Sequence, residues 1–477
     1  MLPFVLLLAA SCAAQSVTLP GGTLQGGQCT TSNASFFYSV PYAQPPTGDL
    51  RFAAPQPYNG TLGQATTPSP KCPQFSQSFI EYPYSEDCLY LNVWVPPNAN
   101  NLPVKVWIYG GGNTAGSISN QTYNGCNLAT DPIVVSVNYR LGPLGFLGLQ
   151  DFGIEGNMGI QDQLLGLRWV RKNIQAFGGD PAACLRSLSL SQLNVTLPRP
   201  TGPTINPASI SGFGPFVDGE IVPANHADVG VQPTRRQRPQ DITEAVYLAY
   251  LNSTFGSAAS TVENRYPVSA FNSTPFPAFS ALVQVYTQTN FWCPAYAGLT
   301  RAAQNGVPVW TYRWGQAPSC AWYNVFPPGV LPIFGAAHTA EIPFVFANVD
   351  NNPPPDGDCS FTAAEKSLSR QMVGFWTSIA ANGNPGSEWP QFETEGTTGI
   401  NIINESSSVT PGMVDYSVCS FFQQISAGAA GNSSTSATSS GADSPVATYT
   451  SGANSMVTQL SWLLVVVAVV GVCTIFM

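Results

Sequence analysis

The amino-acid sequence predicts an α/β fold, and three observations support that prediction. Residues 104–109 (VKVWIY) and 133–138 (IVVSVN) are short, β-branched and nearly continuous in apolar character. Strands that are buried on both faces, as in a parallel sheet covered by helices, have this composition. Between residues 160 and 177, apolar residues recur at helical spacing, which predicts an amphipathic helix of about five turns. The order strand, loop, strand, helix indicates a mostly parallel central sheet flanked by helices.

The following elements are less regular. Gly178 and Gly179 end the predicted helix, and Pro181 follows them. A third buried strand is expected next, but residues 182–212 contain four prolines and no run suited to a central strand. Further along, the pattern predicts helices at 243–255 and 365–382 and a strand at 307–314 (VPVWTYRW).

Composition limits the class of protein. The chain has 477 residues, of which 44% are hydrophobic and 9% are charged, enough for a large core in one domain or two fused ones. The formal net charge is −9, and no basic run indicates a nucleic-acid partner.

The N-terminal segment 1–15 resembles a secretory signal peptide. Residues 1–10 are apolar and small residues follow, and this stretch is too short to span a bilayer. Eight Asn-x-Ser/Thr sequons agree with secretion and glycosylation. They are Asn33, Asn59, Asn120, Asn194, Asn252, Asn272, Asn404 and Asn432.

The C-terminal region predicts attachment to a membrane. Residues 426–455 form a Ser/Thr-rich tract that is typical of a disordered, O-glycosylated stalk. Residues 456–477 end in an apolar tail with no basic residue after it, preceded by small residues that include Ser451 and Gly452. This pattern predicts a GPI-attachment signal at Ser451 or Gly452, with a C-terminal membrane helix as the alternative. The expected location is the extracellular face of the cell surface.

The eleven cysteines predict a disulfide framework. Cys12 and Cys473 lie in the segments that are expected to be removed, so nine remain. In an oxidising compartment most of these should pair, and an odd count leaves at least one without a partner inside the chain.

Three successive glycines, Gly110 to Gly112, follow the first predicted strand. A tight turn without chemistry is one interpretation. The other is an oxyanion hole, because a backbone without Cβ atoms can bring successive N–H groups against a ligand oxygen.

Several motifs decide between these interpretations. Residues 86–94 (EDCLYLNVW) resemble the second signature of the type-B carboxylesterase/lipase family, the cholinesterase-like branch of the α/β-hydrolases. Other motifs agree with that family in order, at 41–43, 51–52, 109–112, 138–142, 156–163, 177–181 and 335–338. The resemblance covers roughly residues 16–425 and is closest to secreted fungal members. It implies an α/β-hydrolase fold and serine-dependent hydrolysis of small-molecule esters or lipids, with no cofactor and no metal.

The resemblance also implies roles for individual residues. Gly111 and Gly112 are expected to donate two oxyanion-hole N–H groups, and His338 is expected to be the general base. Asn113 departs from the family, which usually has an aromatic residue there that shapes the acyl pocket. Substrate size therefore does not follow from the resemblance.

Other family positions are structural rather than catalytic. The resemblance implies a disulfide between Cys72 and Cys88. It also implies ion pairs between Arg51 and Glu86 and between Arg140 and Asp180.

His338 was weighed against other roles. The chain has two histidines, and His226 lies in a Pro-flanked loop that we expect to be exposed. His338 precedes residues 341–346 (EIPFVF), as the catalytic histidine of the family does. A metal site formed by His338 and Glu341 is disfavoured, because no other histidine is nearby in the sequence.

The serine that this chemistry needs is absent. The family places it in a Gly-x-Ser-x-Gly turn shortly after the segment that matches 177–181, and no such motif occurs in the chain. Residues 183–188 instead resemble a later family segment, so the chain passes directly from one to the other near Ala182. The resemblance implies that the usual partner of Cys184 lies in the missing stretch. Ser187, Ser189 and Ser191 lie near the junction but lack flanking glycines.

A second gap is predicted at residues 224–241. The family has a strand there that carries the acid of its catalytic triad, whereas this chain has an Arg-rich sequence without an apolar run. Asp228 and Asp241 are weak candidates for the acid.

Two functions are compatible with these features. The first is a GPI-anchored carboxylic-ester hydrolase whose coding sequence is incompletely joined in this chain, which is then inactive. The second is a non-catalytic, cholinesterase-like surface protein for binding or adhesion. The retained glycine loop and His338 favour the first.

Overall fold

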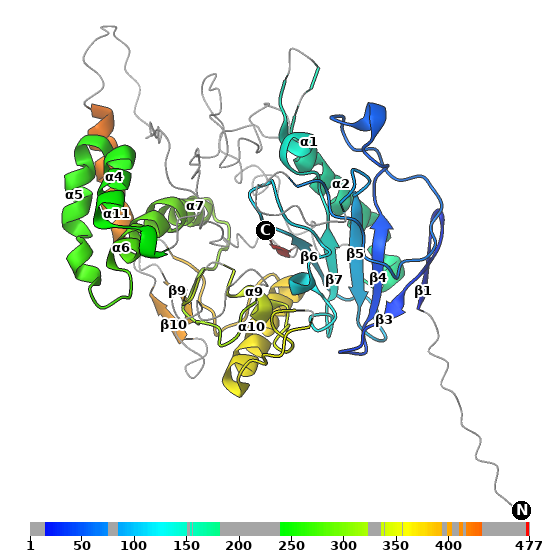
Figure 1. The fold of residues 1–477 in the computed structure, drawn as a ribbon. Helices are drawn as coiled ribbons and strands as arrows, with labels where there is room; N and C mark the ends of the chain where they lie inside the picture. The colour runs from blue at the N-terminus through cyan, green and yellow to red at the C-terminus, as the bar shows by residue number, and fades with distance from the viewer. Residues whose placement is uncertain are drawn as a thin grey trace, which may run out of the picture.

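The architecture is a central sheet flanked by helices, beside a second, helical layer (Figure 1). The computed structural model describes residues 15–74, 84–149, 153–154, 156–181, 239–322, 335–337, 339–354, 356–393, 398–402, 410–413, 416–431 and 474–476.

The central sheet has the strand order β11-β6-β7-β5-β4-β3. Its strands are β3 (Gly27–Gln28), β4 (Ser35–Pro41), β5 (Tyr90–Val95), β6 (Val104–Ile108), β7 (Ile133–Val137) and β11 (Thr474–Phe476). Strand β6 pairs in parallel with β7 and β11, whereas the β7–β5, β5–β4 and β4–β3 pairs are antiparallel. The expectation of a mostly parallel sheet is therefore wrong in detail, because the N-terminal half of this sheet is an antiparallel meander.

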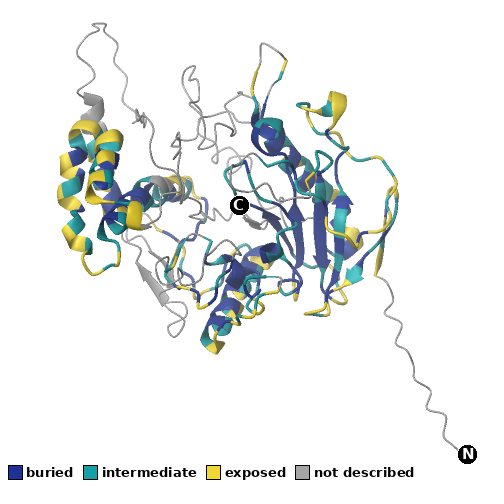
Figure 2. Ribbon diagram, viewed as in Figure 1, coloured by how far each residue is buried: buried dark blue, intermediate teal, exposed yellow. Residues whose placement is uncertain are grey.

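The two apolar runs form the centre of this sheet, which confirms the predicted strands. All five residues of β6 and all five of β7 are buried. In β5 the residues between the two ends are buried as well, whereas its first and last residues are partly exposed (Figure 2). Side chains on both faces of these strands are removed from water, which is why neither run alternates between apolar and polar residues.

The outer edge of β6 is paired rather than open. Strand β11 aligns Thr474 with Lys105 and Phe476 with Trp107 in a parallel register. Three C-terminal residues therefore pair with the β6 edge.

Helices cover both faces of the sheet. Helices α1 (Gly142–Phe146) and α2 (Met158–Asn173) are followed by the short helix η4 (Ile174–Phe177), which ends at Gly178 with φ 84°. Gly166 of α2 lies against Val137, since a Cβ at that glycine would be 2.6 Å from the valine side chain. The predicted helix at 160–177 is thereby confirmed.

The opposite face is covered by α9 (Ile342–Val345) and α10 (Ala363–Asn382). Ile108 of β6 is paired with Val137, so its side chain lies on the same face as α2. Side chains alternate along a strand, and Lys105, three residues earlier, therefore points to the opposite face, where it contacts Thr377 of α10. Helix α10 begins with a capping box between Thr362 and Glu365. This confirms the predicted helix at 365–382.

The helical layer has a hydrophobic core of its own. It contains α4 (Glu244–Phe255), α5 (Ala259–Arg265), α6 (Pro277–Thr287), α7 (Cys293–Gln304) and α11 (Ser417–Gly431). Figure 1 shows α4, α5, α6 and α11 together on the side of the molecule away from β4 and β5. Thr243 caps α4, in agreement with the helix predicted at 243–255.

Two small sheets and several short helices complete the fold. The hairpin β1 (Ser16–Leu19) and β2 (Gly22–Gln25) precedes the central sheet, and β8 (Tyr312–Trp314), β9 (Thr398–Ile402) and β10 (Thr410–Met413) form a separate sheet. The strand predicted at 307–314 is thus formed only at its end. The short helices are η1 (Gly48–Leu50), η2 (Gln121–Tyr123), η5 (Pro239–Asp241), η6 (Gly256–Ala258), η7 (Val268–Phe271) and the π-helical η8 (Gln288–Trp292).

Four disulfides link the described parts of the chain. They are Cys29–Cys126, Cys72–Cys88, Cys293–Cys419 and Cys320–Cys359. The Cys72–Cys88 bond is the one implied by the family resemblance. Within the described residues, no helix combines the length and apolar character that crossing a membrane requires.

Candidate active site

The glycine loop, Gly110 to Gly112, begins at the end of β6, where β6 and β7 are linked by contacts between two tyrosines. Tyr109 follows β6, Tyr139 follows β7, and their rings stack with centroids 4.7 Å apart. Each hydroxyl donates to the backbone carbonyl of the other tyrosine, at 3.2 Å and 3.0 Å. Burial raises the pKa of both phenols, so both remain neutral hydrogen-bond donors at ordinary pH. The loop is therefore anchored to the rigid centre of the sheet.

The backbone of the loop turns sharply at Gly111. This residue has φ 133°, and the backbone N–H groups of Thr114 and Ala115 donate to its carbonyl oxygen at 3.2 Å and 3.1 Å. A Cβ at this position would lie 2.0 Å from the carbonyl oxygen of Ala115, so only glycine fits.

The amide of Gly111 is available to a ligand. Within the described part of the chain its N–H donates to no acceptor. An unused backbone donor at a strand end is the arrangement that an oxyanion hole requires. The role of Gly111 and Gly112 as oxyanion-hole donors stays a prediction.

The far side of the loop is held by side-chain and backbone contacts. Gln74 accepts from the N–H of Gly116 at 3.1 Å and donates to its carbonyl at 2.7 Å. Asn113 has a left-handed φ of 58°, and its carbonyl accepts from the N–H of Gly142 at 2.6 Å. These contacts fix the loop against the start of α1, so its donors are positioned before any substrate binds.

The first of the expected ion pairs lies at the surface. The Nε of Arg51 donates to Glu86 at 2.6 Å, and a second guanidinium nitrogen contacts the other carboxylate oxygen. This pair has bidentate geometry but lies in a partly exposed position, where its contribution to stability is small.

The second expected ion pair has a different partner. Arg140 donates through Nε and a terminal nitrogen to both carboxylate oxygens of Asp162 on α2, at 2.8 Å and 2.7 Å. Both side chains are almost fully buried. The prediction of Asp180 as the partner of Arg140 was wrong, because α2 turns Asp162 towards the end of β7, where Arg140 begins the next loop.

The remaining predicted site residues divide into two groups. Asp241 lies exposed at the end of η5, just before α4, and nothing in its position marks it as a catalytic acid. The other positions lie outside the described residues: His338, Asp228, Ser187, Ser189, Ser191, Cys184, Ser451 and Gly452.

Glu341 is a titratable group that the sequence considered only as a metal partner. Burial raises its pKa to about 7, so this carboxyl exchanges its proton near neutral pH. It lies three residues after His338, at the start of α9. Among the residues that the structure describes, no three potential metal ligands converge.

Lys105 is a buried cation that the sequence pattern concealed within an apolar run. Its ammonium donates to the hydroxyl of Thr377 at 2.8 Å. Desolvation lowers its pKa to about 7. The sequence does not indicate that Lys105 is buried as a charged group, because the residues on either side of it form an ordinary apolar strand.

Comparison with known proteins identifies the family. The sequence profile of the carboxylesterase family matches residues 13–183 and 233–418. The chain belongs to the carboxylesterase family. Its match is interrupted between residues 183 and 233, within the region where the sequence departs from the family pattern.

Individual relatives agree with this assignment. The para-nitrobenzyl esterase of Bacillus subtilis (strain 168) is 30% identical over an alignment that covers 80% of this chain and 93% of that protein. Mouse cholinesterase is 48% identical over a shorter alignment that covers 30% of this chain and 27% of that protein.

A third relative shows how this member of the carboxylesterase family departs from others. The alignment with mouse acylcarnitine hydrolase, at 27% identity, extends over 482 positions but uses only 77% of this 477-residue chain, and it covers 84% of the hydrolase. The relative therefore contains stretches with no counterpart here.

Proposed function

We propose that this carboxylesterase-family chain retains the substrate-stabilising loop of an ester hydrolase but has no nucleophile, and that it does not turn over esters. The observation that carries the proposal is the combination of the Gly111 donor with the absence of a Gly-x-Ser-x-Gly motif. Serine is the covalent nucleophile of this chemistry, and a loop that stabilises an oxyanion has no reaction to accelerate without it.

For the gene, we propose a secreted carboxylic-ester hydrolase that acts on a small-molecule ester or a lipid. Two features support it: the preorganised glycine loop and the alignment positions of the relatives that have no counterpart here. Translating the genomic interval between the codons for Pro181 and Cys184 tests it, with a Gly-x-Ser-x-Gly segment as the expected result. A continuous exon with nothing skipped would exclude an incompletely joined coding sequence.

The second candidate is a non-catalytic surface protein for binding or adhesion, and the absence of the serine motif favours it. A continuous exon between these codons is the result expected for this candidate. Ester turnover by the protein purified from its native cell would exclude it.

For localisation, we propose a GPI anchor attached at Ser451 or Gly452. Attachment there removes every later residue, including β11 and its pairing with the β6 edge. Release of the protein from cells by a phosphatidylinositol-specific phospholipase supports the anchor. Retention of the C-terminal peptide containing Phe476 in the cell-surface protein would contradict it and support a membrane helix.

A further inference from the structure

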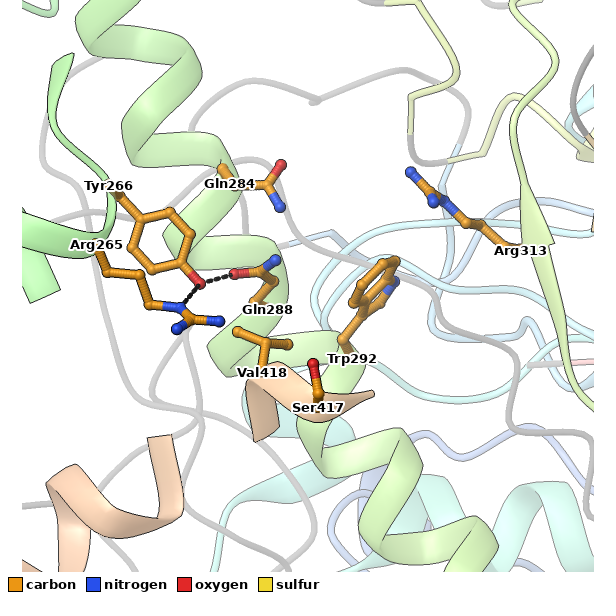
Figure 3. Close-up of a pocket in the computed structure, with 8 residues that line it drawn as sticks. All are labelled: Arg265, Tyr266, Gln284, Gln288, Trp292, Arg313, Ser417 and Val418. Atoms are coloured by element: carbon orange, nitrogen blue, oxygen red, sulfur yellow. Dashed lines mark hydrogen bonds between the residues drawn. The ribbon is translucent and has the colours of Figure 1, made fainter. Parts of the chain in front are cut away.

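An open pocket of about 440 Å³ lies at the surface where α5, α6, η8, β8 and α11 meet, and the two arginines that line it, Arg265 and Arg313, are exposed (Figure 3). Its size is within the range of small-molecule sites. The described residues that line it are Arg265, Tyr266, Gln284, Gln288, Trp292, Arg313, Ser417 and Val418. We refer to it as the arginine pocket.

The two arginines have no carboxylate partner among the described residues. Within the described part of the chain, neither Arg265 nor Arg313 forms an ion pair, and no Asp or Glu is among the described lining residues. This is unusual for a protein of net charge −9. Two guanidinium groups without an acidic side chain among the described lining residues favour a locally positive pocket.

Each guanidinium is held by aromatic rings and not by an acid. Arg313 lies over the ring of Trp292 at 5.2 Å, and Arg265 lies over the ring of Phe421 at 4.7 Å. Contacts of this kind position the cation while leaving most of its N–H donors unused.

A hydrogen-bond chain that runs from the exposed Arg265 to the buried Gln288 adds a further donor. Arg265 Nε donates to the hydroxyl of Tyr266 at 3.3 Å, and this hydroxyl donates to Gln288 Oε1 at 2.6 Å. The amide oxygen of Gln288 is thus occupied. Its amide nitrogen has no acceptor among the described residues, although the side chain is buried. The unused groups around Gln288 are therefore donors, which suit an anion.

Figure 3 shows Arg265 and Gln288 on one side of the pocket and Arg313 on the other, with Trp292 between them. We propose that the arginine pocket binds a small dicarboxylate, with one acidic group at Arg265 and Gln288 and the other at Arg313. This site is independent of ester hydrolysis, because it is built from the helical layer together with strand β8, and none of its described lining residues belongs to the glycine loop.

Titration calorimetry on the full chain tests the proposal. The probes are linear dicarboxylates of four to eight carbons, the monocarboxylates of equal length, and inorganic phosphate. We expect saturable binding of at least one dicarboxylate, and binding of its monocarboxylate and of phosphate weaker by at least about tenfold, because each lacks one of the two contacts. Equal affinity for the monocarboxylate or for phosphate, or no binding of any dicarboxylate, would overturn the proposal.

Matched arginine variants locate the site. Arg265→Gln and Arg313→Gln should each weaken dicarboxylate binding by at least about tenfold. The control is Arg301→Gln, an exposed arginine on α7 outside the pocket, which should bind as the unaltered chain does. Near-ultraviolet circular dichroism verifies that each variant is folded. If the pocket variants and Arg301→Gln bind alike, the proposal is wrong.

Discussion

The sheet core and the helical layer of this protein use their charged residues differently. In the sheet core, Arg140 is buried and fully paired with Asp162, and the carboxylate of Glu365 accepts hydrogen bonds from Ser319 and Thr362. In the helical layer and the adjoining strand β8, Arg265 and Arg313 line an open pocket without a carboxylate partner among the described residues. The charged side chains of the sheet core therefore stabilise the fold through buried hydrogen bonds and ion pairs. In our proposal, the two arginines of the pocket instead bind a ligand.

The largest change in the free energy of unfolding is expected when the buried ion pair between Arg140 and Asp162 is broken. Replacing Arg140 by Met leaves the carboxylate of Asp162 buried without its partner, which should lower the free energy of unfolding by about 3–5 kcal/mol. Urea denaturation measures it. The matched control is Arg51→Met, which breaks an exposed pair and should change stability far less. Equal effects of the two substitutions would show that burial does not distinguish the pairs.

Substitution of Lys105 should raise the free energy of unfolding, whereas substitution of Arg140 lowers it. Its pKa is lowered to about 7 in the folded protein, so between pH 7 and the unfolded value of 10.5 the unfolded chain binds the extra proton. The free energy of unfolding should therefore rise with pH in that window, by up to about 1.4 kcal/mol per pH unit.

Lys105→Met removes this dependence. The variant should be more stable than the unaltered chain at pH 7, by roughly 3 kcal/mol, and Thr377 keeps its own hydrogen bond to the carbonyl of Val373. Urea denaturation at pH 7, 8 and 9 measures both effects. A variant with the same pH slope as the unaltered chain would show that Lys105 is not the titrating group.

A smaller loss is expected at the start of α10. Glu365 accepts from the N–H groups of Ser319 and Thr362 at 2.7 Å and 2.9 Å while fully buried. Glu365→Ala leaves these donors without their acceptor and should cost about 2–3 kcal/mol. Lys366→Ala, next to it but partly exposed, is the control and should have little effect. An equal loss of stability in both variants would show that the buried hydrogen bonds of Glu365 are not what distinguishes the two positions.

The smallest change in stability is expected at the arginine pocket. Arg265→Gln and Arg313→Gln remove no ion pair among the described residues, so urea midpoints should stay close to that of the unaltered chain. A large destabilisation by either variant would make these arginines structural, as in the sheet core, and would remove the contrast between the two regions.

Much of the sheet core could be predicted from local pattern. The runs at 104–109 and 133–138 became β6 and β7, and the helical spacing after residue 160 became α2. Features that depend on how distant elements meet could not be predicted. Asp162 reaches Arg140 only because α2 packs back against β7, and β11 was expected to belong to a removable tail.

For the candidate sites too, local sequence pattern could be predicted, whereas contacts between distant elements could not. The glycine loop was predicted, because Gly110 to Gly112 are contiguous and directly follow a strand. The arginine pocket was not, because Arg265, Trp292 and Arg313 come from three elements that approach one another only in the folded chain. The elevated pKa of Glu341 likewise depends on burial by distant residues.

The central claim is that a family hydrolase loop is present here without its nucleophile. Labelling of the purified, folded chain with a serine-reactive fluorophosphonate probe tests it most directly, with an active serine esterase as the positive control. The account predicts that this chain remains unlabelled while the control is modified. Covalent labelling that Ser187→Ala abolishes would contradict it, because a serine near the junction would then be serving as the nucleophile.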